Sequence, residues 1–510
     1  MSLRSSQTVL ALFALFIAPA LAAVPPLTPR VVPPKGAYVI AQDTADVPRI
    51  VIKFQEGTHV RVRNGQLKQL VDEQDASERQ AMQARGLHNQ QVQSELQAVM
   101  GLIQLHPQVQ GLQRLFSAPE QLLATQRRTG EQRSGKELAD LDLYVELALL
   151  PGTQHGAVRS LVAQLDAMVS VETAYAEPMA SPAAVDIAPP SPALVTEQRY
   201  LRPAPLGIDA DYAWTKRGGN GTNVRIVDVE GGWRTSHEDL PALFHTGGTQ
   251  IADLHWRDHG TAVLGTMVGV ANAYGVSGIA HGAQAGYESI GSQSTASGIE
   301  SAARAAGDGG VVLIELHAAG PDDGTPCACN PGQCKYIAME YWQATFDVIS
   351  QATSNGTTVV EAAGNGTANL DSAIYHDLFN RNFRDSGAVL VGAASDAGRA
   401  PMCWTNYGNR VDVHGWGESV VTLGYGSRFN AGGDEDQYYT ATFNGTSSAS
   451  PIVTGSVACI QGAMQGAGRF PLSPVAIRDL LVTTGTPQSP DSRNIGPRPN
   501  LRAAFNKLRL

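Results

Sequence analysis

Residues 224–232 read Val-Arg-Ile-Val-Asp-Val-Glu-Gly-Gly, a short apolar run followed at once by acidic residues and two glycines. Similar apolar runs recur at 311–314, 358–360 and 388–391, and helix-like stretches separate them. Runs of this kind, bounded by glycine or polar residues, are typical of strands that are buried on both faces. From about Gln198 onward the pattern therefore predicts an α/β fold, with a parallel sheet flanked by helices.

Three polar segments stand out within this pattern. Asp228 follows its strand directly, which places it at the carboxyl edge of the predicted sheet, where such folds bind ligands. His259, in Asp-His-Gly-Thr, precedes a helical stretch of small residues, although a lone histidine is more often structural. Ser447, in the Gly-Thr-Ser-Ser-Ala-Ser-Pro stretch of residues 445–451, follows a glycine-led turn and opens a helix. A nucleophilic serine needs that placement, because the positive end of the helix lies nearby; Pro451 is expected in the first helical turn.

Together these segments resemble the subtilisin-like serine protease family, peptidase S8. The order Asp, His, Ser is that of the family, with spacings of 31 and 188 residues. The resemblance implies a catalytic triad of Asp228, His259 and Ser447 in a three-layer domain. It also implies an oxyanion role for Asn365, which stands in Val-Val-Glu-Ala-Ala-Gly-Asn-Gly at 359–366. The implied activity is that of a serine endopeptidase acting on polypeptides through an acyl-enzyme on Ser447.

The chain also departs from the family pattern. Where the family commonly has Asp-Thr/Ser-Gly, this chain has Asp228 followed by Val-Glu-Gly, so Glu230 is a second acid nearby. The substrate-binding strand of the family corresponds to His317, Ala318, Ala319 and Gly320. A sedolisin-type acid protease would have Glu as the base and Asp in place of the oxyanion Asn. The other alternative is a catalytically inactive, secreted peptide-binding scaffold with the same fold.

The N-terminal part divides into three segments. Residues 1–22 have a positive charge, a ten-residue apolar run and an Ala-Leu-Ala site, which are typical of a cleavable signal peptide. In residues 23–177 the expected strands are 49–54, 141–150 and 169–175, with a helix at 157–168 and a Gln-rich helical part at 73–133. The Pro-rich residues 178–198 are the expected linker and maturation site. The resemblance implies that 23–177 is a smaller α+β propeptide that inhibits the catalytic domain, residues 199–510.

Export to the periplasm or the medium makes disulfides possible, and the chain has five cysteines. Cys327, Cys329 and Cys334 are close in sequence, so we expect one local disulfide there; a zinc site would need a fourth ligand. Because five is odd, at least one thiol is free or pairs with another chain. Cys459 lies in an apolar helical stretch and is expected to be buried.

The composition excludes some partners. The net charge is −10 and both parts are acidic, which disfavours nucleic-acid binding through phosphate contacts. After the signal no apolar stretch approaches membrane-spanning length. The triad chemistry requires no cofactor. No metal site is assigned, although the carboxylates at 434–436 could bind structural calcium, the alternative being a solvated acidic loop.

Overall fold

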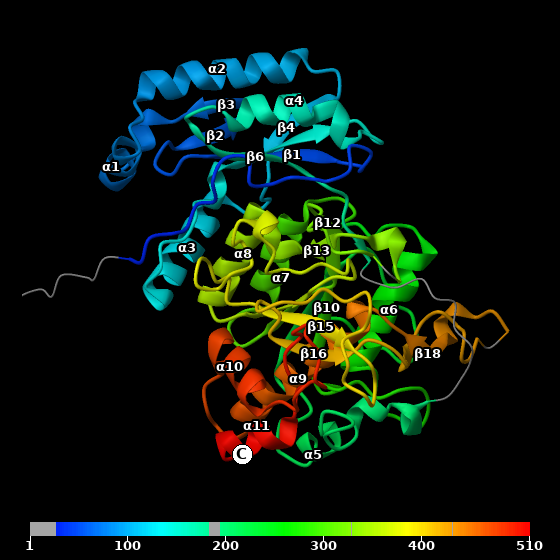
Figure 1. The fold of residues 1–510 in the computed structure, drawn as a ribbon. Helices are drawn as coiled ribbons and strands as arrows, with labels where there is room; N and C mark the ends of the chain where they lie inside the picture. The colour runs from blue at the N-terminus through cyan, green and yellow to red at the C-terminus, as the bar shows by residue number, and fades with distance from the viewer. Residues whose placement is uncertain (1–26, 183–193, 328, 431) are drawn as a thin grey trace, which may run out of the picture.

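The computed structural model describes residues 27–182 and 194–510, apart from Ala328 and Ala431. The predicted signal peptide and most of the linker lie outside the described residues. Figure 1 shows an N-terminal region with a small sheet, seated on a larger domain that extends to the C-terminus.

The larger domain is built on a seven-stranded sheet in which every neighbouring pair is parallel. Across the sheet the strands are β16 (Val413–Trp416), β15 (Val389–Ala394), β14 (Thr358–Ala362), β11 (Val311–Ile314), β8 (Arg225–Glu230), β10 (Gln284–Ser289) and β9 (His245–Gly247). The strands expected from the apolar runs are all present. The predicted parallel α/β fold is confirmed.

The two faces of this sheet carry different helices. Val227 and Val229 of β8 belong to the core that includes α7 (Thr295–Ala306) and α8 (Gln343–Ser354). Ile226 instead belongs to the core that includes α6 (Leu254–Val268) and α9 (Thr446–Gly466). Side chains alternate between faces along a strand, so Asp228 and Glu230 share the face of Ile226. Both carboxyl groups are therefore directed toward the α6 and α9 side.

The N-terminal region holds a four-stranded antiparallel sheet. Its order is β4 (Val109–Arg114), β5 (Tyr144–Leu149), β1 (Arg49–Phe54) and β6 (Val171–Glu177). Helices α2 (Asn89–Leu105) and α4 (His155–Asp166) lie on its outer side, away from the larger domain (Figure 1). The predicted strands and the helix near 157–168 are confirmed. The Gln-rich part is not helical throughout, because β4 separates α2 from α3 (Glu120–Ser134), and α1 (Ala76–Ala84) precedes α2.

Aromatic and polar side chains join the two regions. Tyr175 of β6 stacks on Trp342 with ring centroids 5.8 Å apart, and its hydroxyl oxygen accepts a hydrogen bond from the Ala344 N–H at 3.1 Å. Tyr341 Oη donates to the carbonyl oxygen of Ala37 at 2.9 Å. Tyr144 of β5 hydrogen-bonds the carboxyl group of Asp347 on α8. The N-terminal region is therefore packed firmly against α8.

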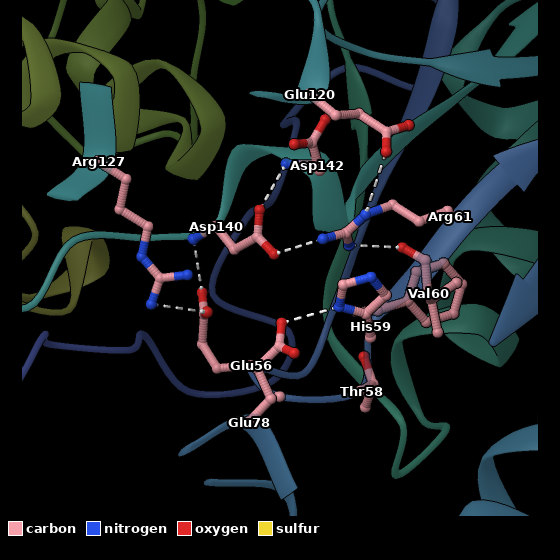
Figure 2. A network of polar contacts seen from close by, with 12 residues as sticks. Glu56, Thr58, His59, Val60, Arg61, Glu78, Glu120, Arg127, Asp140 and Asp142 are labelled. Atoms are coloured by element: carbon pink, nitrogen blue, oxygen red, sulfur yellow. Dashed lines mark hydrogen bonds and ion pairs between the residues drawn. The ribbon is translucent and has the colours of Figure 1, made fainter. Parts of the chain in front are cut away.

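Helix α3 forms a second connection. Arg133, near its C-terminal end, donates to the carbonyl oxygen of Asn355 at 2.6 Å and to Asp308 Oδ2 at 2.9 Å, both on the larger domain. Figure 2 shows Arg127 of the same helix directed toward Glu56, with Arg127 Nη2 3.7 Å from Glu56 Oε2. Glu56 lies just after β1, and its Oε1 also accepts from the Asp140 N–H at 3.1 Å. Helix α3 thus links the small sheet to the larger domain.

The described residues contain further α-helices and strands, besides short 3-10 helices. They are β2 (Val60–Arg63), β3 (Gln66–Gln69), β7 (Ser181–Pro182), α5 (Ala210–Ala213), β12 (Leu316–Ala319), β13 (Tyr336–Ala338), β17 (Val420–Leu423), β18 (Tyr439–Phe443), α10 (Pro474–Thr484) and α11 (Leu501–Leu508). Among the helices of the described ranges, none is long and apolar enough to cross a membrane.

Candidate active site

Ser447 is the second residue of α9, as the sequence predicts. Gly445 precedes the helix with φ of 93°, a conformation that favours glycine over any side-chain-bearing residue. The N–H of Ser447 is among the first four of the helix, which have no acceptor within the helix, so it can serve a bound anion. Pro451 is the sixth helical residue rather than part of the first turn, so its predicted place is corrected. Its missing N–H leaves the Ser447 carbonyl without the usual helical donor.

His259 lies on α6, fully buried, and its ring contacts an acid from β8. The distance from His259 Nδ1 to Glu230 Oε2 is 2.6 Å. Gly260 allows this approach, because a Cβ at that position would lie 2.4 Å from the Gly232 oxygen. The prediction that Asp228 contacts the imidazole is therefore corrected: Glu230 does so. The reason is reach, since Glu230 lies one pleat nearer the end of β8 and carries one more methylene.

Asp228 is also fully buried, but it holds a different partner. Trp233 Nε1 donates to Asp228 Oδ2 at 2.8 Å. The Trp233 ring stacks on Tyr287 of β10 with centroids 4.2 Å apart. Asp228 thus fixes the loop after β8 and lies behind Glu230 rather than beside His259.

Asn365 follows β14 and contacts the residue before Ser447. Asn365 Oδ1 accepts from the Thr446 N–H at 2.9 Å and from Thr446 Oγ1 at 3.0 Å. Because the amide oxygen is held on this side, Nδ2 is directed away from Thr446; it lies 3.4 Å from Gln333 Oε1. The structure therefore brings Asn365 to the start of α9, where an oxyanion donor would be needed.

The predicted substrate strand is present as β12, which contains His317, Ala318 and Ala319. It pairs with β13 on one edge and with β7 on the other, both antiparallel. In the β7 pairing Leu316 lies opposite Pro182 and His317 opposite Ser181. His317 Nδ1 also accepts from the Asn365 N–H at 3.2 Å, which ties this strand to the Asn365 loop. The chain's own segment at the start of the Pro-rich linker therefore forms a strand along β12.

Glu315 was not singled out by the sequence analysis. It comes directly after β11, is fully buried and accepts a hydrogen bond from Ser450 Oγ. Burial raises the pKa of its carboxyl group well above the ordinary value, while the Ser450 and Ser447 hydroxyls act in the opposite direction. Its signal in the sequence was an acid at the carboxyl end of a buried strand, the same signal that marked Asp228.

The sequence around Glu230 also contained a motif signal that the prediction of the triad did not use. Glu230-Gly231-Gly232 fits the spacing of Asp-Thr/Ser-Gly if glutamate stands for aspartate, and that placement agrees with the contact to His259. Asp228 keeps the aspartate of the motif, whereas Glu230 keeps the spacing to its glycine, so the motif alone did not decide between the two acids. Only the side-chain positions distinguish them.

The cysteines form two disulfides among the described residues, Cys327–Cys334 and Cys329–Cys403. The expected local bond is present, but the second bond spans 74 residues and was not predicted. Because Cys327, Cys329 and Cys334 are all in disulfides, they do not form the alternative zinc site. Cys459 is free and buried, as expected. Within the described ranges no cluster of three or more His, Cys, Asp or Glu could hold a metal ion. In the carboxylate loop at 434–436, Glu435 and Asp436 pair with Arg234.

Comparisons with known proteins bear on the family and the fold of the chain. The model of the subtilase family, Peptidase_S8, matches residues 234–498, slightly more than half of the chain. An extracellular protease of Xanthomonas campestris is 28% identical over 339 residues, covering 58% of this chain and 52% of the relative. Subtilisin NAT of Bacillus subtilis subsp. natto is 27% identical over 285 residues, covering 53% of this chain and 65% of the relative. The alignments thus span less than two thirds of either relative.

Among solved structures, fervidolysin from Fervidobacterium pennivorans, described as a keratinolytic enzyme related to subtilisin, superposes with a TM-score of 0.55. The match covers 94% of this chain and 64% of fervidolysin at 16% identity, so it supports the fold, including the N-terminal region. The family match begins four residues after Glu230, so Glu230 rests on the geometry alone. By its family match, its parallel sheet and the arrangement of these residues, the chain belongs to the subtilase family.

Proposed function

We propose that the protein is a serine endopeptidase, exported as a zymogen to the periplasm or the medium, that hydrolyses polypeptides through an acyl-enzyme on Ser447. The observation that carries the proposal is the contact between His259 Nδ1 and Glu230 Oε2, made from α6, a helix that packs against α9. An imidazole held at one nitrogen by a buried carboxylate presents its other nitrogen as a base. A peptide-binding scaffold has no need of this arrangement.

Each residue has one task in the proposed reaction. His259 Nε2 accepts the Ser447 hydroxyl proton while Ser447 Oγ forms a bond to the substrate carbonyl carbon. Glu230 fixes the ring and stabilises the imidazolium that results. When the tetrahedral intermediate collapses, His259 returns the proton to the leaving amine. Water then gives a proton to His259 and forms a bond to the acyl carbon. When this second intermediate collapses, the bond from that carbon to Ser447 Oγ breaks and His259 returns the proton to Oγ. The chemistry requires no cofactor, and structural calcium stays unassigned.

The oxyanion role of Asn365 gives a specific prediction. Asn365→Ala should lower kcat by about 10²–10³-fold with little change in KM, because the donor acts mainly on the charge that develops in the transition state. Steady-state kinetics on a peptide substrate measures both constants. The matched control is Asn369→Ala, four residues downstream on the same loop. An unchanged kcat for Asn365→Ala would remove Asn365 from the mechanism.

The N-terminal region is proposed to act as an inhibitory propeptide. The support is the pairing of β7 with β12, because an extended substrate would add a strand to the same edge. We therefore expect self-cleavage in the Pro-rich linker, between about residues 178 and 200.

Labelling with a fluorophosphonate probe tests the proposed activity. Secreted protein whose N-terminal sequence begins within or after the linker should be labelled, and a heat-denatured sample should not, because only an activated serine reacts. Mature, folded protein that takes no label would favour the inactive scaffold. A sedolisin-type enzyme would instead be most active in acid; His259 and Asn365, where that class has Glu and Asp, argue against it.

A further inference from the structure

Two buried carboxyl groups lie one behind the other at the end of β8. Asp228 and Glu230 are two residues apart on one strand, so their side chains share a face, and both have no solvent exposure. In the neighbouring strands Tyr287 lies opposite Asp228 on one side and Leu313 on the other. Water therefore cannot stabilise charge on either carboxyl group.

One oxygen of each carboxyl group contacts a nitrogen of a neighbouring ring. Asp228 Oδ2 accepts from Trp233 Nε1 at 2.8 Å, and Glu230 Oε2 is 2.6 Å from His259 Nδ1. The other oxygens, Asp228 Oδ1 and Glu230 Oε1, are buried and receive no N–H or O–H donor from the described part of the chain. A buried acceptor without a donor is costly, and so are two adjacent buried negative charges. One proton between the two oxygens would remove both costs.

The surroundings supply little compensating positive charge. The titratable and charged groups on β8 and the packed elements are Arg225 on β8, Glu315 after β11, His255, Arg257, Asp258 and His259 on α6, Arg234 after β8, Tyr287 and Glu288 on β10, Glu300 and Arg304 on α7 and Cys459 on α9. Arg304 pairs with Glu300, its Nε 3.3 Å from Glu300 Oε1. Glu288 and Glu300 belong to the other side of the sheet, and Arg234 pairs with Glu435 and Asp436. Among the described ion pairs, the group that meets this carboxyl pair is His259, which carries a positive charge only when it is protonated.

The direction of the pKa shifts agrees with one shared proton. Burial raises the pKa of Asp228 well above its ordinary value, and the charge of Glu230 and a hydrogen bond to Glu230 raise it further. Burial also raises the pKa of Glu230 well above its ordinary value; its hydrogen bond with Asp228 acts in the opposite direction, and the charge of Glu315 raises it further. Within the pair, the hydrogen bond thus favours the proton on Asp228 over the proton on Glu230.

We propose that Asp228 is a positioning residue that works as a neutral carboxylic acid, donating its Oδ1 proton to Glu230 Oε1 so that Glu230 holds His259 as a single, fixed carboxylate. The proposal rests on the proposed function for its catalytic consequence, but the protonation itself does not. It explains why two acids occupy this strand end. Trp233 orients Asp228, Asp228 orients Glu230, and Glu230 orients His259.

The first test is the pH profile of Asp228→Asn. Asparagine can accept from Trp233 through Oδ1 and donate to Glu230 through Nδ2, so it reproduces the hydrogen bonds of the neutral acid. We expect kcat of the same order as the parent and an unchanged acid limb of kcat/KM. The alkaline limb of kcat/KM should move to higher pH. The parent loses the Asp228 proton as the pH rises past the raised pKa of that group, whereas asparagine has no such proton to lose. Glu300→Gln, a buried carboxyl-to-amide change on α7, is the matched control.

Two results would overturn the proposal. If Asp228 were ionised, Asp228→Asn would remove a negative charge near His259 and lower the acid limb by about one pH unit or more. If Asp228 itself oriented His259, kcat would fall by about 10⁴-fold. Either outcome excludes the neutral-acid role.

The second test does not depend on activity. Infrared difference spectra of full-length Ser447→Ala protein, with and without Asp228→Asn, should show loss of one carboxylic-acid C=O band at neutral pH. Glu230→Gln in the same background should shift that band without abolishing it, which covers the case in which Asp228→Asn does not fold. Spectra without such a band overturn the proposal. Absence of fluorophosphonate labelling contradicts the proposed protease function alone, so the two failures are distinguishable.

Discussion

Ser447→Ala should leave the secreted chain uncut and reduce turnover by about 10⁶-fold, which is the largest effect we expect. Without Oγ no acyl-enzyme forms, and no other described group stands at the start of α9 in the same position. Self-cleavage fails for the same reason, so the product should retain the N-terminal region. Mass spectrometry and N-terminal sequencing measure the cut, and the fluorophosphonate probe measures the nucleophile.

The adjacent serine gives a matched control. Ser448 Oγ donates to the carbonyl oxygens of Trp416 at 2.8 Å and Gly445 at 3.0 Å, so it is engaged in holding the turn. Ser448→Ala should therefore keep the label, with reduced stability. A Ser447→Ala chain that is labelled, or that is cut at the same bond when expressed alone in a protease-deficient host, would contradict the assignment.

Glu230→Gln should lower kcat by about 10⁴-fold, the second largest effect. A glutamine amide can donate to His259 Nδ1 and so stabilise the tautomer that carries its proton on Nε2. That nitrogen could then no longer accept the Ser447 proton. The expected signature is a loss of kcat at nearly constant KM, because the glutamine side chain leaves the predicted substrate strand β12 in place.

The neighbouring strand provides the control for Glu230. Glu288 of β10 makes the same type of contact, with its Oε2 2.7 Å from His245 Nε2, outside the proposed site. Glu288→Gln should keep kcat within the range of the parent. If Glu230→Gln kept its activity while Asp228→Asn lost 10⁴-fold, the triad acid would be Asp228 after all.

Much of the fold followed from local patterns. Apolar runs such as 224–227 and 311–314 predicted the parallel strands, because strands buried on both faces leave no polar alternation. In the N-terminal region 49–54 matched β1 in full. The strand β4 was missed, since its two Gln residues, its glycine and its arginine give a weak apolar signal within a Gln-rich segment. Only its pairing with β5 makes it a strand.

The site was predicted less completely, for a geometric reason. His259, Ser447 and Asn365 stand in distinctive local motifs, so their positions could be transferred one by one. Asp228 and Glu230 share one face of one strand, and the sequence does not say which of two acids reaches the ring. The long disulfide Cys329–Cys403 was equally hidden, because it joins segments that only the folded chain brings together.

The anchoring of helix α3 has a consequence for when the proposed enzyme would become active. In the uncut chain, α3 and β7 contact the larger domain from the same molecule, so the substrate edge of β12 faces a tethered competitor at a high effective concentration. A cut in the linker after β7 would break the tether but leave every one of these contacts intact. Occupancy of the β12 edge by the released N-terminal region would then depend on the protein concentration. Dilution after export, rather than the cut itself, would set the moment at which β12 accepts another chain.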